Sequence, residues 1–166
     1  MLKIIRLLAL VVMTSGFAFA QDAELRNRMD PRENLTTSGQ PTFESLEALA
    51  EEGFTTVIDL RRPEEDRGID EQASVEALGM SYISLPIDGA NGINFDNADA
   101  INMILAEIDG PALIHCGSGN RAGAVLALAE SLNGADDEAA LQFGLNAGLT
   151  GHETVVRQRL KEAEDP

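Results

Sequence analysis

The sequence predicts an α/β fold of three layers, a mainly parallel central sheet with helices on both faces. Short apolar or β-prone runs alternate along the chain with longer segments of helical periodicity. Glycine, asparagine and proline separate the runs, and no internal repeat or low-complexity segment interrupts them. Strands that alternate with helices form βαβ units, and the strands of such units run parallel.

Residues 1–20 have the composition of a secretory signal peptide. Lys3 and Arg6 give a positive start, an apolar run follows, and small residues form a cleavage sequence before Gln21. The apolar run is too short to favour a membrane-spanning helix of about 20 residues, and an uncleaved anchor is the alternative. We expect export, to the periplasm of a double-membraned bacterium or out of the cell, and a single domain over residues 21–166.

Acidic residues dominate the composition. The chain has 28 acidic and 12 basic residues, a net charge of −16. This balance argues against binding to nucleic acid or to an anionic membrane surface, and a phosphate-like ligand would need a local cluster of positive charge. The chain has one cysteine and therefore no internal disulfide.

The first elements are predicted by composition and turn residues. Residues 21–32 are polar and predict a frayed lead-in. Residues 35–38 are β-prone and predict a short edge strand, followed by a turn. Thr42 suits the cap of a helix with an apolar stripe, which Gly53 ends.

The rest of the chain continues the alternation. Residues 54–60 predict a central strand, and residues 80–85 predict a strand after an intervening helix. A helix over residues 96–108 follows, with Asp96 or Asn97 as its cap. Residues 111–114 predict a buried strand, and three more helices are expected over residues 122–132, 136–149 and 153–163, the second weakened by two glycines.

The loop after residues 111–114 contains the only cysteine, in His115-Cys116-Gly117-Ser118-Gly119-Asn120-Arg121. Gly117 and Gly119 allow positive φ angles, so that the amides of the loop converge. The helix N-terminus beside them favours an anion or a thiolate. We interpret Cys116 as a nucleophile, the amides of Gly117, Ser118, Gly119, Asn120 and Arg121 as an anion seat, and Arg121 also as a positive clamp. A buried structural cysteine is the alternative.

Ligands of parallel sheets gather at the carboxyl ends of the strands. We therefore expect loops 59–67, 86–91 and 115–121 to lie at one rim. Asp88, in the second loop, is a candidate general acid, and a turn-forming role is its alternative. Arg61, in the first loop, is a candidate for substrate binding, and pairing with neighbouring carboxylates is its alternative.

The two histidines have different expected roles. Strand alternation points the His115 side chain away from the thiol side, where we expect it to brace the loop through a hydrogen bond; a purely structural histidine is the alternative. His152 is expected to be solvated. No metal-ligand spacing and no dinucleotide-binding fingerprint is present in the sequence.

Four stretches together resemble one bacterial group. The chain is similar to the phosphatase-like domain of beta-lactamase hydrolase-like proteins, within the cysteine-dependent, tyrosine and dual-specificity-like phosphatases. The stretches are Ser38-Gly39-Gln40-Pro41, residues 53–61, Leu85-Pro86-Ile87-Asp88 and residues 115–121.

The resemblance implies a reaction and roles. Cys116 would form a phosphocysteine, Arg121 would clamp the phosphate, and Asp88 would protonate the leaving group. The implied partner is a phosphorylated substrate of unknown class, with no cofactor.

The loop departs from typical tyrosine phosphatases in two respects. Four residues rather than five separate Cys116 from Arg121, and Ala122 stands where a serine or threonine often helps the thiolate to depart. The pattern Cys-x-Ser-Gly-x-Arg is also similar to the active loop of rhodanese-like sulfurtransferases, in which the cysteine carries a persulfide. A sulfurtransferase and a non-catalytic anion-binding protein are therefore the alternatives.

Overall fold

The computed structural model describes residues 24–164 of the chain. The predicted signal peptide over residues 1–20 lies outside the described residues. Within them, no helix combines the length and the apolar character needed to cross a membrane.

The centre of the fold is a five-stranded sheet in the order β1-β2-β5-β3-β4. Only β1 runs antiparallel to its neighbour, and the other pairs are parallel. The strands are β1 (Met29–Arg32), β2 (Leu35–Ser38), β3 (Thr56–Asp59), β4 (Ser81–Ser84) and β5 (Ala112–His115).

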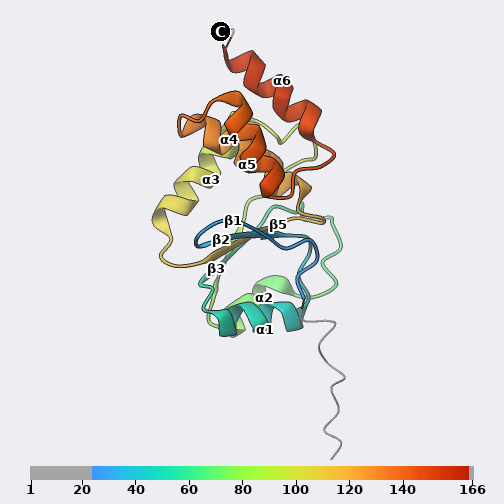
Figure 1. Cartoon of the computed structure of the whole chain (residues 1–166). Coiled ribbons are helices and arrows are strands. Elements are labelled where there is room, and N and C mark those ends of the chain that lie inside the picture. Colours follow the sequence, from blue (N-terminus) through green and yellow to red (C-terminus); the bar gives the residue numbers. More distant parts are fainter. Residues whose placement is uncertain (1–23, 165–166) are drawn as a thin grey trace, which may run out of the picture.

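Helices cover both faces of this sheet, which confirms the predicted three-layer α/β fold (Figure 1). On one face lie α1 (Phe43–Glu52) and α2 (Glu71–Ala77). On the other lie α3 (Phe95–Glu107) and α4 (Asn120–Leu132), with α5 (Asp137–Asn146) and α6 (Glu153–Glu164) packed against α4.

Alternation along the inner strands divides the core into two clusters. Val57 and Leu113 belong to the cluster under α1 and α2. Ile58 and Ile114, their neighbours in sequence, belong to the cluster under α4. Successive side chains of a strand point to opposite faces, so residue parity in β3 and β5 decides which layer each side chain joins.

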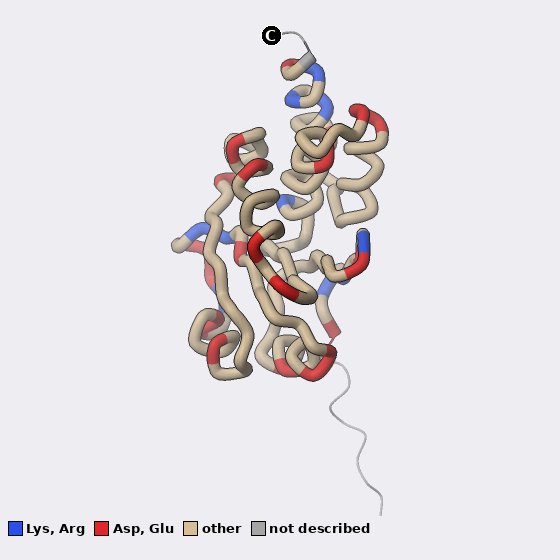
Figure 2. Tube along the Cα trace, turned by 90° about the vertical axis from the view of Figure 1, so that its left-hand side faces the viewer, with Lys and Arg blue, Asp and Glu red and all other residues tan. Residues whose placement is uncertain are grey.

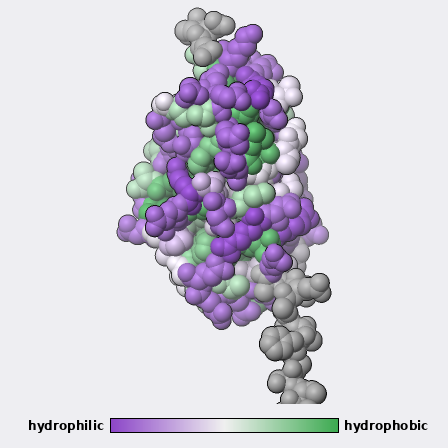
Figure 3. All heavy atoms as spheres, in the orientation of Figure 1, coloured by the Kyte–Doolittle hydropathy of each residue, from purple (hydrophilic) through white to green (hydrophobic). Residues whose placement is uncertain are grey.

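The surface matches the acidic composition. Acidic residues are spread along helices and loops rather than gathered in one place (Figure 2). On the face shown in Figure 3, hydrophobic atoms form small separate patches between hydrophilic ones.

Three expectations about the elements need correction. Residues 29–32 form β1 instead of a frayed lead-in. Most side chains of β1 are exposed, so its sequence lacks the alternation of apolar and polar residues that predicts a strand. Residues 35–38 form an inner strand, since β1 pairs along their outer side. The cap of α3 is Asn94, whose side chain accepts from the amide of Asn97 at 2.9 Å.

Two glycines let α4 and α5 approach to backbone contact. A Cβ on Gly123 would lie 2.2 Å from the amide nitrogen of Leu149, and one on Gly144 would lie 2.6 Å from the Cβ of Ala127. Gly144 therefore serves packing at the helix interface, and α5 ends at Asn146, before the predicted residue 149. Because α4 starts beside the cysteine loop, this contact also fixes the position of that loop.

We predict that Gly123→Ala destabilises the fold by at least about 1–3 kcal/mol, because the added methyl group must displace backbone rather than a side chain. Urea unfolding followed by circular dichroism measures the change. Gln142→Ala, an exposed substitution on α5, is the control and should change the free energy of unfolding by less than about 0.5 kcal/mol. Equal effects of the two variants would contradict the tight contact.

Candidate active site

The carboxyl ends of the parallel strands meet in register at one rim. Ser38 of β2 and Asp59 of β3 both pair with His115 of β5, and Ser84 of β4 pairs with Asp59. Cys116 directly follows His115, at the first position beyond this row. The rim predicted from topology is therefore the place where the cysteine loop begins.

Cys116 lies between the end of β5 and the start of α4, and its residue is 1% exposed. The amide of Gly119, the N-cap of α4 with φ of +90°, donates to the cysteine sulfur at 3.2 Å. An amide donor and the positive end of a helix dipole therefore both lie at the cysteine sulfur.

Arg121 joins three loops at the rim. Its Nη1 donates to the carbonyl oxygens of Leu60 and Ile87 at 3.3 and 3.0 Å. Nη1 and Nη2 each donate to one carboxylate oxygen of Glu65 at 2.6 Å. The loops expected to meet here do meet, and one guanidinium connects them.

Glu65 leaves part of this guanidinium for a ligand. It occupies the end edge, formed by Nη1 and Nη2. The side edge, formed by Nε and Nη2, has no oxygen acceptor at Nε in the described part of the chain. Hydrogen bonding to Glu65, opposed by burial and aided by the nearby Cys116 sulfur, raises the pKa of Arg121. Two parallel donors next to a sulfur suit two oxygens of a tetrahedral anion.

Sequence reasoning did not single out Glu65, which was expected only to pair with neighbouring arginines. The hydrogen bonds from Arg121 outweigh burial and lower the pKa of Glu65 to about 2. Its Oε1 also accepts from the amide of Arg62 at 2.9 Å. No local pattern marks this role, because its partner lies 56 residues further along the chain.

Asp88 reaches the same rim. Ile87, its neighbour, contacts Arg121 through its carbonyl oxygen. The Asp88 carboxylate itself is 61% exposed and accepts from Nη1 of Arg62 at 2.8 Å. In this structure the candidate acid therefore points toward Arg62.

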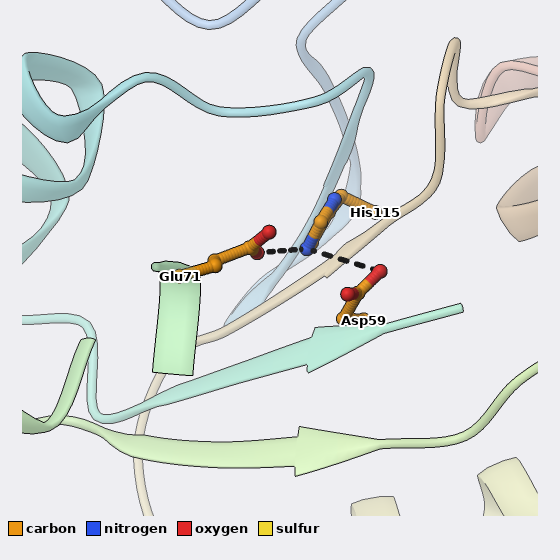
Figure 4. Close-up of side chains that lie close together, drawn as sticks. All are labelled: Asp59, Glu71 and His115. Carbon is orange, nitrogen blue, oxygen red and sulfur yellow. Dashed lines mark ion pairs between the residues drawn. The ribbon is translucent and has the colours of Figure 1, made fainter. Parts of the chain in front are cut away.

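His115, Asp59 and Glu71 lie close together in the interior (Figure 4), and Arg61 joins them in a buried polar cluster. His115 Nε2 lies 2.5 Å from Glu71 Oε1 and 3.7 Å from Asp59 Oδ1. Arg61 donates to Asp59 and to the other oxygen of Glu71. All four side chains are at most 1% exposed. Successive residues of a strand point to opposite faces. The His115 side chain therefore lies on the face covered by α1 and α2, whereas Cys116 packs on the opposite face.

The expectation that Arg61 faces substrate is corrected by this burial. The Arg61 side chain is 1% exposed and forms ion pairs with the carboxylates of Asp59 and Glu71. A charge buried this completely needs partners of opposite sign, and Asp59 and Glu71 supply them. The sequence alone places Arg61 at the rim but does not show that its side chain points into the interior.

Two further side chains complete the cluster at Asp59. Tyr82 Oη and Arg67 Nε donate to Asp59 Oδ2 at 2.8 and 2.9 Å. Burial and the Asp59 carboxylate raise the pKa of Tyr82 to about 12. Burial works against the charge of Asp59, but His115 and the hydrogen bonds outweigh it, so the pKa of Asp59 lies below its usual value.

Asp59, Glu71 and His115 are the one group in residues 24–164 whose ligand atoms lie close enough to consider a metal ion. Their chemistry does not fit one. A zinc ion would sit about 2.0–2.2 Å from each nitrogen and oxygen ligand, and a separation of 2.5 Å between His115 Nε2 and Glu71 Oε1 is too short for that. Arg61 and Arg67 already pair with the two carboxylates.

The loop is also held from its far side. The Asn120 side-chain oxygen accepts from the amides of Thr150 and His152 at 2.8 and 3.4 Å, which ties the start of α4 to the segment before α6. His152 is half-buried rather than fully solvated. Burial and the charge of Arg121 lower its pKa.

The N-terminal residues Arg26 and Asn27, part of the expected frayed lead-in, contact the loop as well. Arg26 Nη2 donates to the carbonyl oxygen of Gly117 at 2.9 Å, and Asn27 Nδ2 donates to that of Ser118 at 3.1 Å. A cleft of about 500 Å³ opens beside Arg26, lined by residues such as Gln40, Phe43 and Ile69. Polar composition alone does not distinguish residues that contact a loop in this way from residues of a frayed terminus.

Comparison with known proteins identifies the family of the chain. Residues 29–133 match the family described as "Beta-lactamase hydrolase-like protein, phosphatase-like domain". The chain belongs to this family. The resemblance found in the sequence is therefore confirmed, and the match includes the whole loop from His115 to Arg121.

Curated relatives in the beta-lactamase hydrolase-like family are longer. The protein of that name from Agrobacterium fabrum is 33% identical over 106 residues, which cover 61% of this chain and 24% of the relative. The Xylella fastidiosa protein is 32% identical over 110 residues, 64% of this chain and 25% of the relative. The chain thus spans about a quarter of the length of these relatives.

Solved structures share the fold at low identity. A putative phosphatase from Neisseria meningitidis has a TM-score of 0.69 at 21% identity and covers 81% of this chain and 96% of its own. TpbA from P. aeruginosa, in complex with pTyr, has a TM-score of 0.59 at 21% identity, with 82% and 88% covered. The PP-IP phosphatase SIW14 from S. cerevisiae has a TM-score of 0.57 at 14% identity, with 85% and 93% covered.

We predict that Glu65→Gln weakens the acid dependence of stability. The pKa of Glu65 is about 2 in the fold, against an ordinary value of 4.5 for a glutamate side chain. A lowered pKa stabilises the fold fully above the unfolded value, and this contribution is lost as pH falls from about 4.5 toward 2. At pH 6 the variant should be less stable by about 1 kcal/mol, as for a partly exposed ion pair, and the difference should shrink at pH 3.

Urea unfolding at the two pH values tests this. Glu64→Gln is the matched control, because Glu64 is 62% exposed and pairs only with Arg62. A pH-independent difference between Glu65→Gln and the parent would contradict the role of this carboxylate.

Proposed function

We propose that this protein is an exported cysteine-dependent phosphatase that hydrolyses phosphate monoesters through a phosphocysteine on Cys116. The observation that carries the proposal is the convergence of the Gly119 amide and the Arg121 guanidinium on one sulfur atom. The family match supports a phosphatase-like activity, and the composition of residues 1–20 supports export.

In the first step the thiolate of Cys116 attacks phosphorus. The side edge of Arg121 binds two phosphoryl oxygens, and the amides of the loop neutralise the charge that grows on them. The sulfur–phosphorus bond forms as the bond from phosphorus to the ester oxygen breaks. Asp88 donates a proton to the departing oxygen, for which it must leave Arg62 and carry a proton.

In the second step water attacks the phosphocysteine. Asp88, now ionised, takes a proton from that water, the sulfur–phosphorus bond breaks, and inorganic phosphate leaves the restored thiolate. No electron transfer and no co-reactant besides water is needed. Arg121 holds the phosphoryl group through both steps, and Glu65 holds Arg121.

The charge of the chain places a condition on the substrate. A net charge of −16 repels an anionic ester at long range, and salt screens this repulsion beyond about 8–10 Å. Binding then depends on the local positive charge of the loop and Arg121. We expect the substrate to be a phosphate ester, and we leave its leaving group open between protein, lipid and small metabolite.

We predict that the purified protein releases phosphate from p-nitrophenyl phosphate and that Cys116→Ser abolishes this release, at least a thousandfold, because no nucleophile remains. Absorbance of p-nitrophenolate measures the rate. Thiocyanate formed from thiosulfate and cyanide, without phosphate release, would instead establish a sulfurtransferase. Orthovanadate binding without either activity would establish anion binding alone.

We predict that Asp88→Asn slows hydrolysis by about 10²–10⁴-fold for esters with poor leaving groups, because these need a proton in the transition state. Esters of acidic phenols should be slowed much less, and a series of aryl phosphates compares them. Asp96→Asn, in the first turn of α3, is the control. An equal loss across the series would contradict the acid role of Asp88.

A further inference from the structure

We propose that Arg26 and Asn27 are positioning residues that set the amide orientation of the cysteine loop. We call residues 25–28 the arm. The proposal rests on the phosphatase function proposed above, because it assigns these residues to the anion seat of that reaction.

Each of the two side chains holds one carbonyl oxygen of the loop. Arg26 Nη2 donates to Gly117 O at 2.9 Å, and Asn27 Nδ2 donates to Ser118 O at 3.1 Å. The amide of Gln40 also approaches Gly117 O, at 3.4 Å. These oxygens belong to two consecutive peptide units, 117–118 and 118–119, which begin one residue after Cys116.

Each peptide unit is planar, so a hydrogen bond that fixes its carbonyl oxygen also fixes the direction of its N–H donor. In a trans peptide the carbonyl oxygen and the following N–H point in opposite directions, and the described residues contain no cis peptide. Holding Gly117 O and Ser118 O toward the arm therefore directs the amides of Ser118 and Gly119 away from it. The Gly119 amide is the one that donates to the Cys116 sulfur at 3.2 Å.

The arm is itself anchored, so it can transmit this constraint. Leu25 is 6% exposed and packs in the cluster under α1 and α2. The carbonyl oxygen of Arg26 accepts from the amide of Gly39 at 2.7 Å. Asn27 has φ of 55°, a left-handed conformation. Arg28 then faces away from the loop and pairs with Glu52 at 2.9 Å.

Arg26 also brings a positive charge that no carboxylate within residues 24–164 neutralises. Every other arginine of the described residues has a carboxylate at ion-pair distance, and Arg26 has none. In a chain with 28 acidic residues, its guanidinium stands beside the backbone of the nucleophile loop. There it adds positive charge beside the proposed anion seat and favours a bound phosphate.

Two variants test the arm, and a third is the control. Arg26→Gln removes the positive charge and the guanidinium donors. Asn27→Gly removes the side-chain amide, and glycine adopts the positive φ of this position without strain. Arg28→Gln changes the same arm at a residue that does not touch the loop. The readouts are the Kd of orthovanadate by calorimetry, the rate of Cys116 alkylation by iodoacetamide across pH, kcat/KM for p-nitrophenyl phosphate, and the urea midpoint.

We expect Arg26→Gln and Asn27→Gly each to weaken orthovanadate binding and to lower kcat/KM about tenfold, and to slow alkylation at neutral pH, with urea midpoints close to that of Arg28→Gln. If either variant does not fold, Arg26→Lys is the deciding variant. It keeps the positive charge but loses the planar guanidinium that holds the carbonyl oxygen of Gly117. Anion affinity and alkylation equal to those of the control overturn the proposal. Changed alkylation in a protein without phosphatase activity would overturn the proposed function and leave the role of the arm intact.

Discussion

One guanidinium holds the rim of this protein together. Arg121 extends from the start of α4 and binds a carbonyl of the loop after β3, a carbonyl of the loop after β4, and the carboxylate of Glu65. Three loops that are distant in sequence are thereby fixed around one sulfur atom. The remaining edge of the guanidinium is thereby held in one orientation, and the proposed reaction would use it as a preorganised donor.

A second set of charges supports this rim from below. Asp59, Arg61, Glu71 and His115 are buried at the ends of β3 and β5 and the start of α2. Burial of charges is costly, and removing one partner of such a set costs several kcal/mol because the others lose their compensation. The cluster therefore gives the strand ends little freedom, which benefits the loop that starts one residue after His115.

The relation between fold and function here follows a general rule, that one fold serves many activities and the site decides among them. Solved structures at 14–21% identity establish the architecture of this chain. Membership in the phosphatase-like family narrows the activity further. The choice among phosphoryl transfer, sulfur transfer and simple anion binding depends on the donors around Cys116 and on what protonates the leaving group.

Local patterns in the sequence determined the strand-helix alternation, the cap at Thr42 and the cysteine loop, because periodicity, caps and glycine turns act over a few residues. Only the tertiary structure decided the contacts of Glu65, Arg26 and Asn27 with the cysteine loop and Arg121, and the burial of Arg61. Their partners lie 10–91 residues away, and such contacts exist only after the strands have aligned in register. The candidate nucleophile was thus predictable from one short segment, whereas the groups that contact its loop come from the whole fold.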